Sequence, residues 1–152
     1  MTDSAPTGNT PQSVYVPGLR IACRADQAPV PYLGAGWHAI EQDFVWMDGR
    51  EAELVFLMRL PDRPLRLVLD LVPFRHGGLV QTLEVFVNGL RIGFAEVPHA
   101  GAVTLPVPVE AFRGRDCRIA LHCATATIGT DVGLEDKRRL GLALAGWALE
   151  PA

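Results

Sequence analysis

The sequence has no basic excess and no long hydrophobic run. Its 152 residues include 14 Lys and Arg against 17 Asp and Glu, which gives a formal net charge of -3. Because nucleic-acid-binding domains normally carry a basic excess or stripe, this balance predicts that nucleic acid is not a partner. No window of about 18 uninterrupted apolar residues occurs, so we expect no membrane-spanning helix.

Motifs for nucleophilic catalysis are also missing. The sequence contains no GxSxG, GxGxxG, P-loop or CxxC motif, and its only serines, Ser4 and Ser13, lie near the N-terminus. A serine hydrolase needs a hydroxyl group that a neighbouring base activates within a folded site. The sequence therefore excludes serine-hydrolase chemistry.

The N-terminal residues differ in composition from the rest of the chain. Residues 1–13 are small, polar and proline-containing, without the basic and apolar regions of a secretory signal. We expect a flexible lead over 1–13, a single domain over 14–152 and a cytoplasmic location. With 49% hydrophobic and 20% charged residues, the chain has ample material for a core, which excludes disorder throughout.

Apolar residues recur with a period of two along most of the chain. Over 65–71, leucine occupies every second position, as expected of a half-buried strand. The same alternation recurs over 52–60, 83–87, 103–109, 117–123 and 140–144. The pair Asn88-Gly89 predicts a type I′ hairpin, and only 36–48 and 134–139 leave room for a turn of helix. About eight strands with turns between them predict an all-β, antiparallel β-sandwich of the jelly-roll type.

The three cysteines are predicted to be buried free thiols. Cys117 and Cys123 fall on the inward phase of one expected strand, where they would lie about 20 Å apart, too far for a disulfide. Cys23 could pair with one of them only if a neighbouring strand brought it close. Core thiols are the favoured interpretation, and they agree with a reducing compartment.

Four apolar residues fall on the outward phase of their strands, namely Val55, Leu57, Val68 and Phe86. Clustered on adjacent strands, they would form a patch that needs a cover. That cover is either another segment of this chain or a partner, such as a second copy of the chain or another protein. The sequence leaves both alternatives open.

The histidines do not suggest a metal site. His38, His76, His99 and His122 show none of the paired spacings typical of zinc ligands. His122 falls on the outward phase of its strand, and His76 and His99 lie in Gly- and Pro-rich turns. We therefore interpret the histidines as solvated loop or face residues.

Two loops concentrate carboxylates. The first contains Glu41, Asp43 and Asp48, and the second contains Asp131, Glu135 and Asp136. Two acids facing each other across a rim would suit a glycosidase, and the same acids with loop carbonyls would suit Ca²⁺. The chain is small for a hydrolase and lacks EF-hand spacing, so we expect no catalytic residue and no cofactor, with a structural Ca²⁺ as the alternative.

Two tryptophans lie in a polar segment that precedes a core strand. Trp37, His38 and Glu41 are followed closely by Trp46 and Asp48. Aromatic rings stack on the faces of sugar rings, and nearby acids and arginines bind the hydroxyl groups. The alternative is that the two tryptophans plug the end of the sandwich, because large aromatic side chains gain much from burial.

A charged loop over 130–139 leads directly into the last expected strand. The ordinary interpretation is a solvated connection. A sharper hypothesis is that one of its arginines reaches back to Glu41 or Asp48 and fixes the two loops through a bidentate pair. Such a pair would be structural or would line a binding surface.

Four short motifs occur in a characteristic order: G-W-x-x-x-E, V-W-x-D-G-x-E-A-x-L, V-x-V-N-G and D-x-R-x-L-G-L-A-L. In this order they resemble accessory β-sandwich domains of bacterial glycan-assembly proteins such as glycosyltransferases, which look like carbohydrate-binding modules. The resemblance covers about 36–149 and implies a non-catalytic role. It maps the loop residues of that family onto Trp37, Glu41, Trp46, Asp48, Asp136 and Arg138.

Together with His38 and Asp131, these residues form the predicted ligand-binding set. The first hypothesis is a non-catalytic carbohydrate-binding or accessory module linked to bacterial cell-surface polysaccharide, with a glycan as its ligand. The second is a protein-interaction sandwich that docks a glycosyltransferase or a second copy through the outer strand face. The third is a small glycan-active enzyme.

Overall fold

The computed structural model describes residues 13–27, 29–74 and 78–152. The expected N-terminal lead therefore lies outside the described residues, except for Ser13, and the division into lead and domain stays a prediction. No helix in these described ranges is long and apolar enough to cross a membrane.

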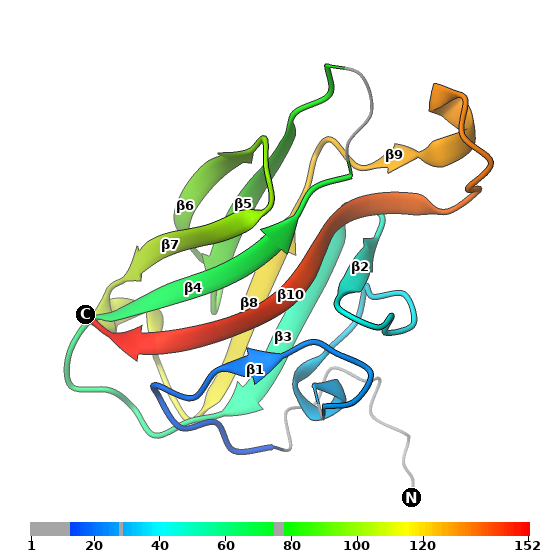
Figure 1. Ribbon diagram of the computed structural model, residues 1–152. Coiled ribbons are helices and arrows are strands. Elements are labelled where there is room, and N and C mark those ends of the chain that lie inside the picture. The colour runs from blue at the N-terminus through cyan, green and yellow to red at the C-terminus, as the bar shows by residue number, and fades with distance from the viewer. Residues whose placement is uncertain (1–12, 28, 75–77) are drawn as a thin grey trace, which may run out of the picture.

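The protein is an all-β antiparallel sandwich, as predicted, and the described residues form two sheets (Figure 1). The first sheet contains β1 (Ile21–Ala22), β2 (Val45–Asp48), β4 (Leu65–Val72), β7 (Gly101–Val107), β9 (Thr127–Ile128) and β10 (Arg139–Pro151). The second contains β3 (Glu51–Leu57), β5 (Gln81–Val87), β6 (Leu90–Val97) and β8 (Asp116–His122) in the order β3-β8-β5-β6. Three short 3-10 turns connect them: η1 (Val30–Tyr32), η2 (Val109–Ala111) and η3 (Gly129–Val132). The strands beyond the expected eight are short, so alternation could not reveal them.

Strand β10 runs through the middle of the first sheet and pairs along both edges (Figure 1). On one edge it pairs with β2 and then with β1, through Leu144↔Val45 and Trp147↔Ile21. On the other edge it pairs with β9 and then with β4, where the register runs to Pro151↔Leu65. Four separate segments of the chain thus form backbone hydrogen bonds with one strand.

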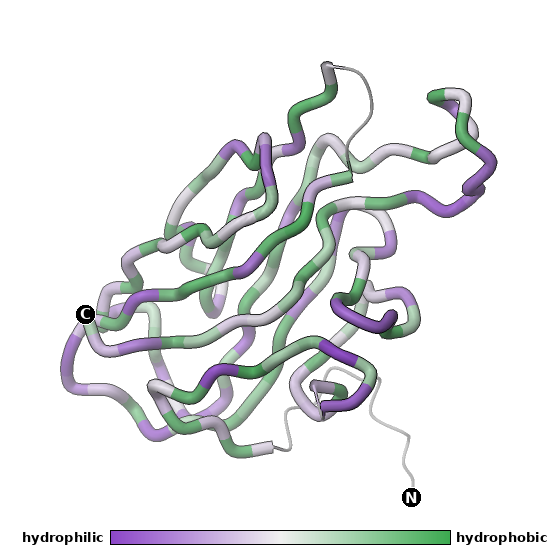
Figure 2. The backbone as a smooth tube through the Cα atoms, in the orientation of Figure 1, coloured by the Kyte–Doolittle hydropathy of each residue, from purple (hydrophilic) through white to green (hydrophobic). Residues whose placement is uncertain are grey.

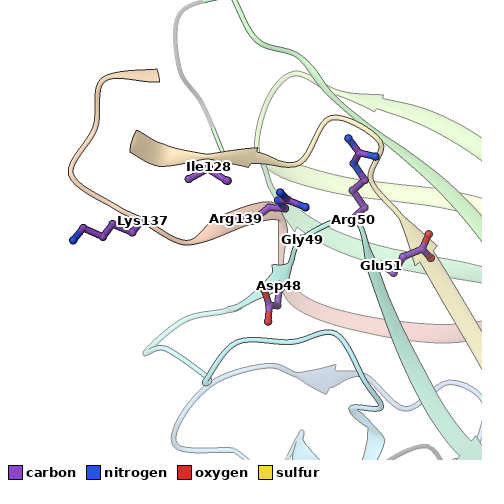
Figure 3. Close-up of a pocket in the computed structure, with 7 residues that line it drawn as sticks. All are labelled: Asp48, Gly49, Arg50, Glu51, Ile128, Lys137 and Arg139. Carbon is purple, nitrogen blue, oxygen red and sulfur yellow. The ribbon is translucent and has the colours of Figure 1, made fainter. Parts of the chain in front are cut away.

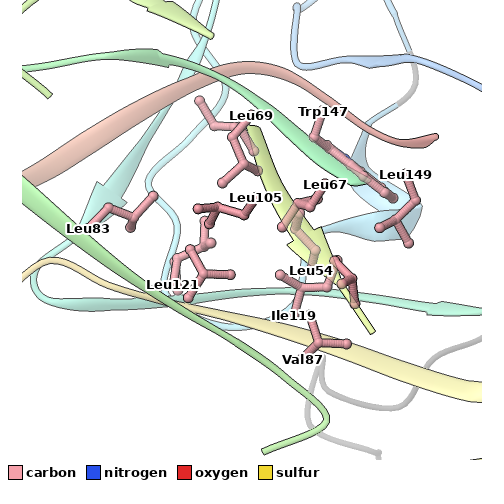
Figure 4. Packing of buried hydrophobic residues seen from close by; sticks show 14 of the residues in the cluster. Leu54, Leu67, Leu69, Leu83, Val87, Leu105, Ile119, Leu121, Trp147 and Leu149 are labelled. Carbon is pink, nitrogen blue, oxygen red and sulfur yellow. The ribbon is translucent and has the colours of Figure 1, made fainter. Parts of the chain in front are cut away.

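The core lies between the two sheets and consists of the alternating residues that the sequence pattern assigned to it. Figure 4 shows side chains such as Leu54 and Ile119 from the second sheet facing Leu67 and Leu149 from the first. Hydrophilic residues gather instead in the loops beside β2 and before β10 (Figure 2). Packing of the two inward faces against each other is the main source of stability in such a sandwich.

The Asn88-Gly89 hairpin is confirmed, because both residues have positive φ, 49° and 87°. The expectation of a helical turn is wrong in both places. Residues 36–48 fold back on themselves as an extended pair that ends in β2, with Trp37 opposite Met47. Residues 134–139 are irregular, and the nearby helical turn is η3. In the segment 36–48, backbone pairing within the hairpin outweighs local propensity.

Tyr15 fastens the first described segment to the core. Its ring stacks on Trp147 at a centroid distance of 4.8 Å and lies 5.2 Å from Phe56. Its hydroxyl donates to the Leu19 carbonyl at 2.5 Å and accepts from the Leu149 backbone N–H at 2.8 Å. The segment also pairs with the edge of β3, where the Tyr15 N–H donates to the Leu57 carbonyl.

The three cysteines are free and buried, as predicted. Burial raises the pKa of Cys23 and of Cys117 to about 12, and it also raises the pKa of Cys123. Thiols are poor nucleophiles when their pKa is raised in this way, so these residues serve as core side chains.

The expected outward patch does not form. Val55, Leu57 and Phe86 belong to the second sheet, whereas Val68 belongs to the first, so the four side chains share no face. Val55 is only 2% exposed, and the others are half-buried. At the edge of β3, the backbone at Val14 pairs with Leu57. Strand alternation could not show that β3 and β4 lie in different sheets.

Gln81 is a fully buried polar residue that joins the two sheets. Its side-chain oxygen accepts from the Phe74 N–H at 2.6 Å. Its side-chain nitrogen donates to the carbonyls of Leu140 and Gly141 at 3.4 and 3.2 Å, within an irregular part of β10. This amide satisfies backbone groups that the strand pairing leaves open, which alternation alone did not predict.

We expect Tyr15→Phe to lower the free energy of unfolding by about 1–2 kcal/mol, because it removes the hydroxyl and keeps the ring stack. Urea unfolding followed by tryptophan fluorescence measures the change. Tyr32→Phe is the matched control: its hydroxyl makes an exposed 3.3 Å contact with the Val14 carbonyl, and its loss should cost less than about 0.5 kcal/mol. Equal effects of the two variants would contradict the anchoring role.

We expect Gln81→Leu to cost about 2–4 kcal/mol, because it leaves a buried N–H and two buried carbonyls without this partner. Glu84→Gln on the outward face of β5 removes a surface pair with Arg91 and should cost less than about 1 kcal/mol. The same unfolding experiment compares them. A Gln81→Leu protein as stable as the wild type would show that the amide does not join the sheets.

Candidate functional site

Residues 36–48 form a narrow hairpin at one end of the sandwich. The His38 N–H donates to the Trp46 carbonyl at 2.9 Å, and the Glu41 N–H donates to the Phe44 carbonyl at 2.8 Å. Gly36 begins the hairpin with φ 96°, and a Cβ at this position would lie 2.1 Å from the Glu51 carbonyl oxygen. Only glycine fits such a position. The close approach therefore fixes the point at which the chain stops running beside β3 and enters the hairpin.

The hairpin turns its two tryptophans to opposite sides. Trp37 faces the core, and its indole N–H donates to the Glu53 carbonyl at 2.9 Å, so Trp37 is a plug. Trp46 alternates with the buried Val45 and Met47 and is half-buried on the outward side of β2. It makes edge contacts with Phe44 and Phe74 at centroid distances of 5.4 and 6.3 Å.

Arg138 joins the hairpin to the loop that precedes β10. Its Nη1 lies 3.1 Å from Oε2 of Glu41, and its Nε and Nη2 contact both oxygens of Asp136 at 2.8–3.2 Å. The predicted reach from the charged loop to Glu41 is therefore confirmed. The bidentate partner is Asp136, within the same loop, and not Glu41 or Asp48.

This ion pair holds Asp136 in its charged form. Hydrogen bonds from Arg138 lower the pKa of Asp136 to about 2, and the nearby His38 contributes in the same direction. The same pair raises the pKa of Arg138 above its ordinary value. A glycosidase general acid needs a raised pKa so that it still holds a proton near neutral pH. Asp136 has the opposite property.

His38 connects the ion pair to the outward face of β2. Its Nε2 lies 3.2 Å from the Arg139 carbonyl oxygen and 3.6 Å from Oδ1 of Asp48. Asp48 is exposed and lies two residues after Trp46 on the same side of the strand. Two polar side chains of the hairpin, His38 and Asp48, thus lie on the same side of it as the Trp46 ring.

The structure brings together six of the predicted residues: His38, Glu41, Trp46, Asp48, Asp136 and Arg138. The other two lie apart from this group. Trp37 is directed inward, and Asp131 lies exposed on η3. Sequence spacing could not separate Trp37 from Trp46, because the direction of each ring depends on the hairpin register.

A basic hollow lies beside this group, and the sequence reasoning missed it. It measures about 480 Å³ (Figure 3). Its lining residues are Asp48, Gly49, Arg50, Glu51, Ile128, Lys137 and Arg139. The basic residues come from segments 87 or more positions apart in the chain, and only the pairing of β2 and β9 with β10 brings them together. The run Lys137-Arg138-Arg139 was the one available signal.

The remaining histidines take structural or surface positions in the described residues. Nδ1 of His122 lies 2.6 Å from Oε1 of Glu51, and His99 is exposed. His76 lies outside the described residues. Across the described ranges, no group of three or more His, Cys, Asp or Glu side chains is arranged to hold a metal ion.

No family model matches this sequence, and no curated protein matches it. Solved structures do match the fold, with identities near 10%. A CBM36 carbohydrate-binding module in complex with calcium and xylotriose has a TM-score of 0.52 at 9% identity, over 87% of this chain and 99% of that one. A β-1,3-glucan-binding CBM6 from Bacillus halodurans has a TM-score of 0.50 at 12% identity, over 91% and 98%.

A third structure, a GH115 4-O-methyl-α-glucuronidase with specificity for decorated arabinogalactans, has a TM-score of 0.54 at 11% identity. The match covers 99% of this chain but 19% of the enzyme. At such low identity these similarities show the fold alone, a jelly-roll β-sandwich that the carbohydrate-binding modules among these structures also have.

We expect Arg138→Gln to return the pKa of Asp136 toward its ordinary value of 3.8, because it removes the main cause of the shift to about 2. In the wild type, the contact is complete above pH 3.8 and is lost as the pH falls through about 2. A carboxyl-carbon NMR titration measures both. Lys137→Gln is the control and should leave the titration unchanged; a low pKa that persists in Arg138→Gln would contradict the assignment.

Proposed function

We propose that this protein is a non-catalytic carbohydrate-binding module whose ligand contacts the rim formed by the 36–48 hairpin and the 129–139 loop. The observation that carries the proposal is the position of Trp46. Its half-buried ring lies on the outward side of β2, beside His38 and Asp48. An aromatic face flanked by hydrogen-bonding groups suits a sugar ring, which has an apolar face and a hydroxyl edge.

The rim is held in place before any ligand arrives. Arg138 ties Glu41 to Asp136, and the backbone hydrogen bonds of His38 and Glu41 fix the hairpin around Trp46. A preorganised site loses less entropy on binding than a flexible one. One shallow aromatic site still gives modest affinity, roughly millimolar to micromolar, or about -4 to -8 kcal/mol.

Two of the similar structures support this proposal: one is a module in complex with xylotriose, and the other is a module that binds β-1,3-glucan. The order of short motifs along the chain supports a finer assignment to bacterial cell-surface polysaccharide. Asp136 does not suit the general-acid role of a glycosidase, because its pKa is lowered and it stays charged.

The carboxylates of the rim also bear on whether glycan binding needs Ca²⁺. Glu41 and Asp136 already have Arg138 as their cationic partner. We therefore expect glycan binding to be the same with Ca²⁺ and with a chelator. Binding that disappears with the chelator would place a Ca²⁺ ion at the site and overturn this part of the proposal.

The experiment is a glycan array that includes bacterial surface polysaccharides, followed by calorimetry on the best ligand. We expect Trp46→Ala to lower affinity about tenfold or more, because it removes the stacking surface. The matched control is Phe94→Ala, which removes a 53% exposed aromatic side chain from β6. It should bind like the wild type.

Thermal unfolding of both variants shows whether the fold survives. Specific binding that Trp46→Ala retains in full would contradict the proposed site. If the folded wild-type protein bound no glycan on the array, that result would contradict the proposed function itself.

A further inference from the structure

The basic hollow beside the rim contains cations that have no partner among the described residues. Arg50 precedes β3, Arg139 begins β10, and Lys137 lies two residues earlier; all three are exposed. None of them forms an ion pair or a side-chain hydrogen bond with a residue in the described ranges. Arg138, by contrast, is neutralised by two carboxylates. The hollow therefore has positive charge available for a ligand.

The backbone holds both arginines in fixed positions. The Gly49 N–H donates to the Arg139 carbonyl at 3.1 Å, and the Cys123 N–H donates to the Arg50 carbonyl at 2.7 Å. Gly49 has φ 90°, and a Cβ there would lie 3.4 Å from Cδ of Arg139, so the stem of Arg139 lies against the Gly49 turn. In Figure 3 both guanidinium groups extend to the same side of this turn.

The acidic side chains of the hollow are directed elsewhere. In Figure 3 the Asp48 carboxylate extends to the opposite side of the Gly49 turn. It lies 3.6 Å from Nε2 of His38. Glu51 extends away from both arginines, and its Oε1 lies 2.6 Å from Nδ1 of His122. The side of the hollow that the arginines face is therefore cationic, although the whole chain carries a net charge of -3.

We infer that this hollow binds the carboxylate groups of an acidic glycan, such as one with uronic acid residues; the inference rests on the proposed carbohydrate-binding function. The planar guanidinium group matches a carboxylate through two parallel hydrogen bonds. Asp48 lines the hollow and lies two residues after Trp46, so the hollow adjoins the end of the strand that carries the proposed stacking surface. The carboxylate that reaches Arg50 and Arg139 belongs to a different sugar residue from the one at Trp46, because the arginines extend to the other side of the Gly49 turn from Asp48.

The overall charge favours a glycan over a nucleic acid. A nucleic acid places a phosphate at every nucleotide and would bring many of them near the 17 acidic residues of this chain. A glycan with carboxylates on some of its sugars needs only a small cationic area. A hollow of about 480 Å³ is within the usual size of small-ligand sites.

The test compares an oligogalacturonate with the same oligosaccharide after its carboxylates are reduced to hydroxymethyl groups. We expect the wild type to bind the acidic form about tenfold more tightly than the neutral form at low salt, and the difference to shrink as salt is added. Arg50→Gln and Arg139→Gln should each weaken binding of the acidic form about fivefold and leave the neutral form unchanged.

The chain offers a matched control at the other end of the second sheet. Arg59 follows β3 and Arg115 precedes β8, and these two arginines line a separate hollow with Leu60. Arg59→Gln and Arg115→Gln remove the same charge as the site variants. They should bind both oligosaccharides like the wild type, which separates a local contact from a general effect of net charge.

Lys137 gives an independent measurement of position, because it is the single lysine of the sequence. Acetylation of its amine, followed by mass spectrometry, should slow in the presence of the acidic oligosaccharide. The neutral form should protect it less. This readout reports occupancy of the hollow without relying on a substitution.

Each outcome decides between the two proposals. If the acidic and neutral forms bind equally, or if both arginine variants retain full affinity for the acidic form, the inference is wrong while the carbohydrate-binding function stands. If neither form binds but other glycans do, the inference also fails. A single-stranded oligonucleotide that binds as tightly as the acidic glycan would show a general polyanion site instead.

Discussion

The architecture depends on the backbone pairing of one strand. Strand β10 supplies hydrogen bonds to β2 and β1 on one edge and to β9 and β4 on the other. Two short segments, β1 and β9, have too few residues to form a stable pair alone, so they exist because β10 offers an edge to them. The same pairing carries the rim, since β2 ends the hairpin and the charged loop leads into β10.

Much of the fold could be predicted because the sheets alternate buried and exposed residues. The leucine-rich strand β4 and the Asn88-Gly89 turn can each be recognised from a few consecutive residues. Local patterns do not state which strands share a sheet, and so the predicted patch containing Val55 and Val68 was wrong. Strands as short as β1 and β9 show no alternation, and Gln81 is a polar residue just before the alternating run 83–87, so apolar alternation does not mark it as buried.

The candidate site was only partly predictable for a similar physical reason. Residue types in two loops suggested that an arginine would reach an acid, and Arg138 does reach Glu41. The outward direction of Trp46 and the inward direction of Trp37 follow from hairpin register, which a sequence without clear turn residues leaves undefined. The grouping of Arg50 with Arg139 needs the tertiary pairing of β2 with β10.

The burial of the three thiols determines how this protein reacts with oxidants and alkylating reagents. Cys23, Cys117 and Cys123 lie at or near zero exposure, and burial raises the pKa of each. Oxidants and alkylating reagents react with accessible thiolates, which the native state hardly offers. Modification at these positions therefore requires the sheets to separate, and its rate reports how often the native sandwich opens.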